Sequence, residues 1–455
     1  MTFYIENLGC AKNQVDAETI IASLEQAGHD YVDTPARAEL IIVNSCGFID
    51  SAKEESIDTV LALRVSYPDS KLVMTGCLAE RYSDELKTEM TEVDGFIGNR
   101  CPARFAERLN ELLGGTCGAT SGGTCGATSG AAAGPPSGDI PLRRRFLSFP
   151  GSAFLKIAEG CSNHCSYCAI PLIRGELVSR PRPLVLAELE KLLAAGIREV
   201  NLIAQDLASF GLDRGEAELV PLLEEICRLR GDFWIRLLYL HPDRFPAALP
   251  ELMAADRRIL PYFDLPFQHA SRPLLERMGR RGEAESYLEL IAAIRHQLPR
   301  AVIRSTFLVG FPGESASDFD ALLEFQRQAD LDWLGVFSYS REEGTPAHDF
   351  DGRVPAALAA ERRRSIEEAQ IPITHRRLDR FKNQSLDLLV EEHVQGEDLY
   401  LARGYPHAPE VDGLVVLRAR DLTPGRIVAA RVLRRNGVDL EAVLCQGEAW
   451  TTSKS

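Results

Sequence analysis

The sequence predicts an α/β protein in three folded parts: an N-terminal parallel α/β domain, a partial (βα)6 barrel and a small C-terminal β-barrel. Apolar strand-like runs alternate with helical stretches in two separate regions, a low-complexity segment divides those regions, and short β-like runs end the chain. The 455 residues are enough for several hydrophobic cores.

The first part spans residues 1–113. Strand-like runs at 3–8, 40–44 and 71–75 are each followed by a stretch of helical pattern. This alternation predicts a parallel sheet covered by helices.

A linker is predicted at residues 114–145. From 114 the eight-residue unit GGTCGATS is written twice, without a charge or a large apolar side chain. Such a composition is typical of a flexible linker, and the exact repeat indicates an expansion, so Cys117 and Cys125 are expected to be incidental.

The second region, residues 146–377, repeats the alternation six times and is closed by a polar helix predicted at 355–377. Its six strand candidates are 154–158, 200–204, 235–239, 262–265, 303–309 and 334–339. Six βα units favour a complete or partial barrel, whose functional site lies at the carboxyl ends of the strands.

The last part, residues 378–449, has short β-like runs at 387–392, 414–419 and 426–433. Glycine-containing turns separate them, at Gly413, Gly425 and Gly437. This pattern predicts a small β-barrel. From Arg380 onward there are ten Lys and Arg against eleven Asp and Glu, so this part is nearly neutral.

The whole chain is acidic, with 51 Lys and Arg against 66 Asp and Glu and a net charge of -15. This balance argues against holding nucleic acid by electrostatics alone, and it accommodates a basic partner more easily. No apolar run is long enough to span a bilayer, and the N-terminus lacks the pattern of a signal peptide. The cytoplasm is therefore the expected location, without contact with a membrane.

Eleven cysteines need an explanation, because disulfides are rare in a reducing cytosol. Cys161, Cys165 and Cys168 have the spacing C-x3-C-x2-C directly after the first strand of the predicted barrel. Three thiolates in so short a loop suit a [4Fe-4S] cluster that keeps one iron open. A structural zinc ion is the alternative, with His164 as its fourth ligand.

Cys10, Cys46 and Cys77 each follow one of the three N-terminal strand candidates. Because parallel strands open into one crevice at their carboxyl ends, these thiols could hold a second cluster. Packing as buried structural cysteines is the alternative. Packing is also the role expected for the three isolated cysteines, Cys101, Cys227 and Cys445.

The spacing at Cys161, Cys165 and Cys168 resembles that of the radical S-adenosylmethionine superfamily. Further motifs and the domain order resemble the methylthiotransferases of that superfamily: residues 8–13 with Asp16, 44–48 and 75–78. Segments 170–181, 265–271 and 402–413 are most similar to members that modify an aspartate of a small-subunit ribosomal protein. The repeated linker departs from the family pattern and touches none of these motifs.

The resemblance implies two [4Fe-4S] clusters, held by the two cysteine triads, and S-adenosylmethionine bound at the open iron of the Cys161 triad. It implies reductive cleavage of this cofactor, with hydrogen abstraction by the resulting deoxyadenosyl radical, sulfur delivered by the second cluster and a methyl group from another S-adenosylmethionine. The expected product is a methylthio group on the β-carbon of the aspartate. The implied partners are a basic ribosomal protein, an electron donor and the ribosome, contacted through the C-terminal barrel, which resembles a TRAM domain.

Four further residues are candidates for cofactor binding at the rim of the barrel. Tyr167, between two of the cysteines, is placed near the adenine by the resemblance, and packing of the loop is its alternative. Gln205, Gln268 and Gly310 follow predicted strands. For Gly310 an ordinary tight turn is the alternative to close approach by the nucleoside. His269, beside Gln268, is as readily a structural histidine as a contact to substrate or cofactor.

The main alternative activity is methylthiotransfer to an adenosine of tRNA, with the same two clusters. The near-neutral C-terminal barrel favours a protein substrate, although Arg418, Arg420, Arg434 and Arg435 could form a basic patch there instead of a solvated face. A non-enzymatic iron–sulfur or RNA-binding protein is a third possibility, which the complete cysteine loop at a barrel mouth disfavours.

Overall fold

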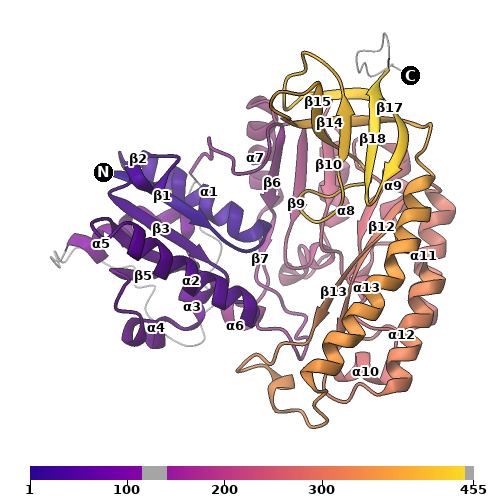
Figure 1. Cartoon of the computed structure of the whole chain (residues 1–455), viewed down its shortest axis with the longest axis horizontal. Helices are drawn as coiled ribbons and strands as arrows, with labels where there is room; N and C mark the ends of the chain where they lie inside the picture. Colours follow the sequence, from indigo (N-terminus) through magenta and orange to yellow (C-terminus); the bar gives the residue numbers. More distant parts are fainter. Residues whose placement is uncertain (115–140, 446–455) are drawn as a thin grey trace.

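The computed structural model describes residues 1–114 and 141–445. Most of the predicted linker, with Cys117 and Cys125, lies outside the described residues. Figure 1 shows the N-terminal domain beside strands β6 and β7 of the second domain. It shows the C-terminal barrel against the amino-terminal ends of that domain's strands.

The N-terminal domain is the predicted parallel sheet with helices around it. Its strands are ordered β2-β1-β3-β4-β5, and all neighbouring pairs are parallel. The predicted strands are β1 (Thr2–Asn7), β3 (Leu40–Ser45) and β4 (Lys71–Gly76), and the short edge strands β2 (Asp30–Tyr31) and β5 (Gly95–Gly98) are additional. The helices are α1 (Ala11–Gln26), α2 (Asp50–Ser66), α3 (Cys77–Arg81), α4 (Ser83–Glu89) and α5 (Phe105–Gly114).

The second domain is the predicted partial barrel of six parallel strands. The strands are β6 (Ser152–Lys156), β9 (Glu199–Ile203), β10 (Trp234–Leu237), β11 (Tyr262–Asp264), β12 (Val302–Val309) and β13 (Trp333–Ser338). They pair as two three-stranded sheets, β10-β9-β6 and β11-β12-β13, joined by one parallel bridge between Ile235 and Ile259.

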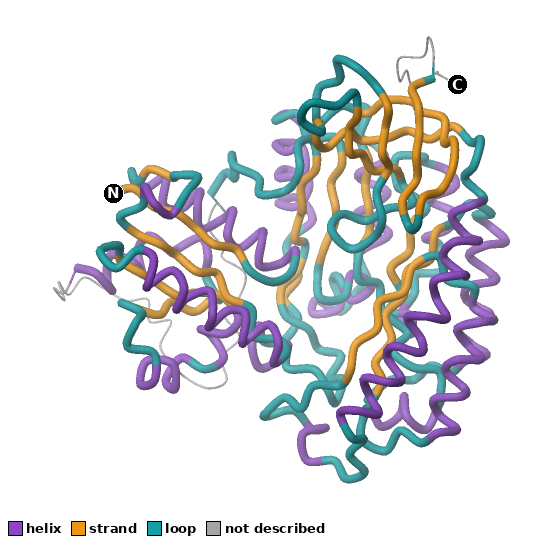
Figure 2. The backbone as a smooth tube through the Cα atoms, in the orientation of Figure 1, coloured by secondary structure: helices purple, strands orange, loops and turns teal. Residues whose placement is uncertain are grey.

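Helices cover the outer face of this open barrel, as Figure 2 shows for the long helices α11, α12 and α13. The main helices are α7 (Arg182–Ala194), α8 (Leu219–Cys227), α9 (Leu249–Ala255), α10 (Arg272–Arg277), α11 (Ala284–Gln297), α12 (Ala316–Ala329) and α13 (Ala356–Asp379). The helix expected at 355–377 is therefore present, and it continues through Pro372.

The C-terminal domain is a closed barrel in the strand order β14-β15-β16-β18-β17. Its strands are β14 (Ser385–His393), β15 (Leu399–Gly404), β16 (Val415–Arg418), β17 (Ile427–Asn436) and β18 (Asp439–Leu444). Three of the five strands lie where short runs were predicted. Strands β15 and β18 were not predicted separately.

The loop after β15 lies against the inner face of the open barrel. Side chains alternate along β6, so that Ala153 and Leu155 pack in the core with the helices while Phe154 packs in a core shared with the C-terminal domain. The Trp333 indole N–H donates to the carbonyl of Pro406 at 2.7 Å, and the Tyr262 hydroxyl donates to Asp412 at 2.6 Å. The C-terminal domain thus fills part of the barrel interior.

A buried ion network joins the same two domains. Glu199 on β9 is 3.0 Å from Arg236 on β10 and 2.5 Å from Arg403 on β15, and Arg403 also contacts Glu391 at 2.6 Å. The carboxylate of Glu199 is completely buried. Each of these charges depends on its partners, because an unpaired buried charge is strongly unfavourable.

His407 lies beside this network and is expected to destabilise the protein in mild acid. Burial, with repulsion by Arg236 and Arg403, lowers the pKa of His407 to about 3. Since the unfolded histidine titrates near 6.5, the folded state binds fewer protons below that pH and loses stability as the pH falls. This group alone should cost about 1.4 kcal/mol between pH 7.5 and pH 5.5.

The measurement is denaturant unfolding of the wild type and of His407→Phe at both pH values. The ring nitrogens of His407 have no hydrogen-bond partner among the described residues, so phenylalanine should be tolerated at pH 7.5. The variant should lose less stability than the wild type on acidification. Equal losses in the two proteins would contradict this origin of the acid sensitivity.

Candidate functional site

The first cysteine triad is held in a fixed loop at the carboxyl end of the first barrel strand. The short strands β7 (Ala158–Glu159) and β8 (Val178–Ser179) pair on either side of this loop and of helix α6 (Ile170–Arg174). The Cys161 N–H donates to Gly175 at 3.0 Å, and the Cys168 N–H donates to the Cys165 carbonyl at 3.0 Å. Asn163 donates to Asp206, after β9, at 3.0 Å. The backbone therefore presents the three thiols from one loop.

Two of these thiols lie where the neutral, protonated form is favoured unless a positively charged ligand binds. Burial raises the pKa of Cys161 to about 11 and that of Cys168 to about 12, and the Cys165 thiol contributes to both shifts. Thiols so placed stay protonated unless a metal neutralises them. Buried thiols gathered in one short loop in this way suit an iron–sulfur cluster.

A zinc site with His164 does not fit the loop. The His164 side chain is 66% exposed and lies 3.9 Å from Glu176, at the surface. Within residues 1–114 and 141–445, no three His, Cys, Asp or Glu side chains surround a single point as one metal ion requires. A cluster does not require this, because each thiolate binds a different iron atom.

Gly160, directly before Cys161, determines how the loop is seated. Its φ is +69°, and a Cβ at this position would lie 2.0 Å from the Glu176 carbonyl oxygen. We expect Gly160→Ala to displace the loop, because both the left-handed conformation and the backbone contact exclude a side chain. Reconstituted Gly160→Ala should lose at least half of its iron, measured per folded chain. Gly215→Ala, also at positive φ but with nothing within 4 Å, is the control and should keep its iron.

The second triad is assembled from three neighbouring strands of the N-terminal sheet. Cys10 caps α1 after β1, Cys46 follows β3, and Cys77 begins α3 directly after β4. A Cβ on Gly9 would lie 3.2 Å from the Sγ of Cys46, and one on Gly47 would lie 2.7 Å from the backbone of Leu78. The strand ends therefore bring the three cysteines into one crevice, as the sequence predicted.

The surroundings of the second triad favour the thiolate form of one of its three cysteines, Cys10. Burial tends to raise the pKa of Cys10, but Lys12, Arg174 and the N–H groups at the start of α1 outweigh burial and lower it. Burial raises the pKa of Cys46, and it raises that of Cys77 to about 11. Burial lowers the pKa of Lys12 itself to about 8, opposed by Cys10.

Arg174 connects the two triads across the domain interface. It ends helix α6, six residues after Cys168, and its side chain is buried. Its guanidinium donates to Asn13 at 2.6 Å and to the Sγ of Cys77 at 3.3 Å, and it forms ion pairs with Asp16 at 3.0 Å and Glu159 at 2.8 Å. The segment that follows the loop of the first triad thus contacts a cysteine of the second triad.

Lys156 strengthens this interface. It contacts Asp16 of the N-terminal domain and Glu159 of the second domain, each at 2.5 Å. Sequence reasoning did not select Arg174, Lys156 or Glu159. The sequence motifs did include two of the partners of Arg174, Asn13 and Asp16, which lie three residues apart on one face of the first turns of α1.

The remaining candidate residues lie around the mouth of the barrel. Tyr167 packs edge-on against Phe311, with ring centroids 6.4 Å apart, and its hydroxyl accepts from Arg280 at 3.3 Å. Gln268 has a φ of +69° and bridges to Phe307. Gln205 lies two residues after Ile203, the last residue of β9.

Gly310, one of the candidates, and His269, beside the candidate Gln268, have structural roles. A Cβ on Gly310 would lie 2.6 Å from the Cβ of Ala359 on α13, so this turn requires glycine for packing. His269 is completely buried, accepts the Ser271 N–H at 3.0 Å and lies 3.5 Å from Glu314. Contact of Tyr167, Gln205, Gln268 or Gly310 with a cofactor remains a prediction.

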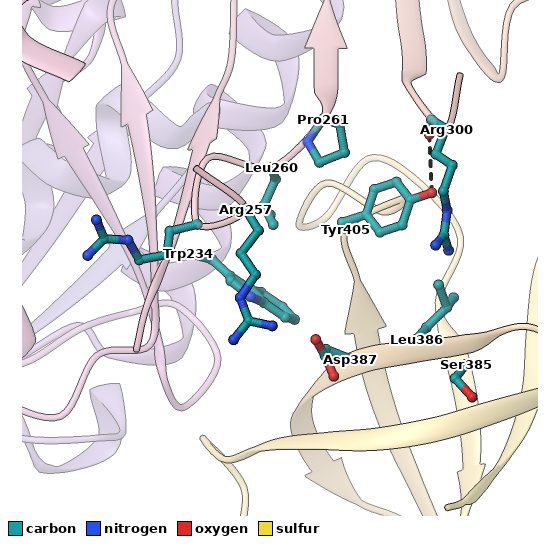
Figure 3. Close-up of a pocket in the computed structure, with 10 residues that line it drawn as sticks. Trp234, Arg257, Leu260, Pro261, Arg300, Ser385, Leu386, Asp387 and Tyr405 are labelled. Atoms are coloured by element: carbon teal, nitrogen blue, oxygen red, sulfur yellow. Dashed lines mark hydrogen bonds between the residues drawn. The ribbon is translucent and has the colours of Figure 1, made fainter. Parts of the chain in front are cut away.

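A cavity of about 270 Å³ lies between the open barrel and the C-terminal domain. Figure 3 shows Trp234, Arg257 and Leu260 on one side of it and Asp387, Leu386 and Tyr405 on the other; the Tyr405 hydroxyl donates to the Arg300 carbonyl at 3.1 Å. Trp234 is the first residue of β10, whereas both triads follow the carboxyl ends of strands. The cavity is therefore at the end of the barrel away from the cysteines.

Comparison with known families divides the chain in the same way. Residues 2–98 match Uncharacterized protein family UPF0004, residues 155–325 match the Radical SAM superfamily, and residues 384–445 match the TRAM domain. No helix of the described ranges combines the length and apolar character needed to cross a bilayer.

Curated relatives match over nearly the whole chain. The ribosomal protein uS12 methylthiotransferase RimO of Treponema denticola is 43% identical, with 96% of this chain and 99% of the relative covered. RimO of Geobacter sulfurreducens is 40% identical over 95% and 96% of the two chains. Among solved structures, the radical S-adenosylmethionine methyltransferase TsrM from Kitasatospora setae matches with a TM-score of 0.56, 17% identity, and coverage of 76% of this chain and 73% of that chain. At this identity the last match shows a shared fold.

The open six-stranded barrel with a C-x3-C-x2-C loop after its first strand defines a radical S-adenosylmethionine enzyme, to which a second cysteine triad and a TRAM barrel are added. Relatives that are about 40% identical over nearly the whole chain then identify the family within this class. The chain belongs to the ribosomal protein uS12 methylthiotransferase family, RimO.

Proposed function

We propose that this enzyme attaches a methylthio group to the β-carbon of an aspartate in ribosomal protein uS12. The observation that carries the proposal is the position of the two cysteine triads at one domain interface, where Arg174, six residues after Cys168, contacts Cys77 of the second triad. Sulfur insertion and radical formation need two separate centres within reach of one substrate carbon. The relatives named for this activity support the same assignment.

The cofactors are two [4Fe-4S] clusters and S-adenosylmethionine. We assign one cluster to Cys161, Cys165 and Cys168 and the other to Cys10, Cys46 and Cys77. When bound, the first cluster supplies the electron that cleaves S-adenosylmethionine, and the second carries sulfur. The protein positions the thiols and joins the two domains beside them with the buried ion pairs of Arg174.

The surface of the C-terminal barrel supports a protein substrate. Arg434 forms an ion pair with Glu441 at 2.7 Å, Arg435 with Asp379 at 3.0 Å, and Arg420 with Asp398 at 2.6 Å. These pairs neutralise three of the four arginines that could otherwise form a basic patch for a tRNA backbone; the fourth is Arg418. We infer that the enzyme works in the cytoplasm with an external electron donor, and that its TRAM barrel contacts the ribosome.

The decisive experiment is mass spectrometry of ribosomal proteins and tRNA from a strain that lacks this gene. We expect uS12 to lose the mass of one methylthio group and tRNA to stay unchanged, with recovery on complementation. Loss confined to tRNA would replace the proposed function with its alternative.

A further inference from the structure

Lys12 carries a buried positive charge that contacts no carboxylate. Its side chain is 5% exposed, and its Nζ lies 3.0 Å from the centroid of the Tyr239 ring. The groups that attract it are first the Cys10 thiol and then Asp264 and Glu159. Among residues 1–114 and 141–445, neither of these carboxylates forms an ion pair with Lys12; their ion pairs are with Arg304, Lys156 and Arg174. Buried lysines are almost always paired, so this ammonium has room for a further anion.

The acidic side chains around Lys12 are already occupied. Asp264 forms an ion pair with Arg304 at 3.2 Å. Asp16 and Glu159 are both bound by Lys156 and Arg174. Within the described ranges, each of these three carboxylates is therefore engaged by another cation, and none of them forms an ion pair with Lys12.

Tyr239 holds the ammonium from the opposite domain. It follows β10 at the carboxyl end of the barrel and has a φ of +67°, which is rare and costly for a bulky residue. Two contacts impose this conformation: its N–H donates to Asp264 at 3.1 Å, and its carbonyl accepts the Leu207 N–H at 2.9 Å. The ring attracts the cation without using its hydrogen-bond donors, which stay available to a ligand.

Lys12 also lies close to residues of both triads' domains. It is two residues from Cys10 in the second triad, and Tyr239 follows β10 at the carboxyl end of the barrel that carries the first triad. The contact between them therefore joins the two domains near both triads. An aspartate brings the carboxylate that Lys12 lacks, whereas asparagine or a nucleobase would leave the ammonium unpaired.

We propose that Lys12, held on the ring of Tyr239, binds the side-chain carboxylate of the substrate aspartate and selects it over neutral side chains. This inference rests on the proposed function, since it names the group by which the same site recognises its substrate. It makes Lys12 a specificity-determining residue of the N-terminal domain.

The test compares Lys12→Met with the wild type, both full-length and reconstituted with iron and sulfide. Binding is measured for uS12 and for a uS12 variant with Asn at the modified aspartate. The wild type should bind the Asp form about 30-fold more tightly, and Lys12→Met should reduce this preference to about 3-fold or less by weakening the Asp form. Lys87→Met, at an exposed lysine on α4, is the matched control and should keep the full preference.

A second variant separates recognition from damage to the nearby triad. Tyr239→Leu removes the ring from the other domain, and it should lower the preference about five-fold with iron content unchanged. Full preference for Asp in either variant with wild-type iron content would overturn the inference. If the wild type modifies uS12 while both variants keep the preference, the inference about Lys12 fails alone. If the wild type neither binds nor modifies uS12, the proposed function fails.

Discussion

Cys161→Ala is expected to abolish cleavage of S-adenosylmethionine, whereas Cys46→Ala should leave cleavage measurable and still prevent methylthiolation. The reason is structural: Cys161 belongs to the loop at the barrel mouth, and Cys46 directly follows strand β3 of a different domain. Each substitution removes one thiol of one triad. Each variant should therefore lose about one cluster's worth of iron while keeping the other cluster.

The measurement pairs iron content per chain with the yield of deoxyadenosine after addition of a strong reductant. Cys227→Ala is the control, because this cysteine ends the outer helix α8, away from both triads. It should keep full iron and full cleavage. Unchanged iron in Cys46→Ala would refute the second cluster at Cys10, Cys46 and Cys77, and deoxyadenosine from Cys161→Ala would refute the first assignment.

The N-terminal domain could be predicted from sequence because its sheet is parallel and buried on both faces. Strand β3 contains the apolar run 40–43 and β4 the apolar run 72–74, and a cysteine follows each of these strands at once. Strand β1 alternates partly buried and buried residues, and Cys10 follows it after two residues. Strand β2 has two residues, and β5 begins and ends with glycine, so neither carries a readable pattern. The sequence therefore placed the three cysteines at the carboxyl ends of neighbouring strands, while the assignment of a cluster to them rests on the family resemblance and stays a prediction.

The C-terminal barrel was predicted less completely. Strand β15 ends in the Arg403-Gly404 pair that enters the domain interface, and β18 alternates acidic and apolar residues over a short span. Strand β15 differs from an ordinary half-buried strand because Arg403 and Gly404 at its end contact another domain. A pattern that depends on such an interface is not visible in a local window of sequence.

The same limit explains which site residues the sequence did not reveal. The C-x3-C-x2-C loop is local, so its spacing alone identifies the chemistry. Arg174 and Tyr239 gain their roles only when two domains meet, and the positive φ of Tyr239 contradicts the preference of its residue type. Such positions need a structure because their partners are distant in the chain: Arg174 is 97 residues from Cys77 and 161 from Asn13.

The interface with the TRAM barrel should depend most strongly on Glu199, and Glu199→Gln is expected to cost about 3–5 kcal/mol. The substitution keeps the shape of the side chain but leaves Arg236 and Arg403 facing each other in a buried site without their shared carboxylate. Arg403 retains Glu391, while Arg236 retains only the carbonyls of Gly404 and Tyr405 as hydrogen-bond acceptors. The loss should therefore appear first as release of the C-terminal barrel.

Limited proteolysis between α13 and β14, together with denaturant unfolding, measures this release. Glu441→Gln is the matched control, since its pair with Arg434 lies at the surface of the same barrel and should contribute nothing measurable. Equal protease resistance and equal unfolding midpoints in the two variants would show that the buried network does not hold the barrel in place.

The pH dependence of the Glu199→Gln deficit gives an independent check. Burial alone would raise the pKa of Glu199, but Arg403 and Arg236 outweigh it and lower the pKa to about 2. Because the unfolded carboxyl titrates near 4.5, the stability that Glu199 contributes is complete above that pH and declines as the pH falls towards 2. The gap between wild type and variant should thus be largest near neutral pH and narrow steadily below pH 4.5. A gap that stays constant over this window would mean that packing, and not the charge of Glu199, joins the two domains.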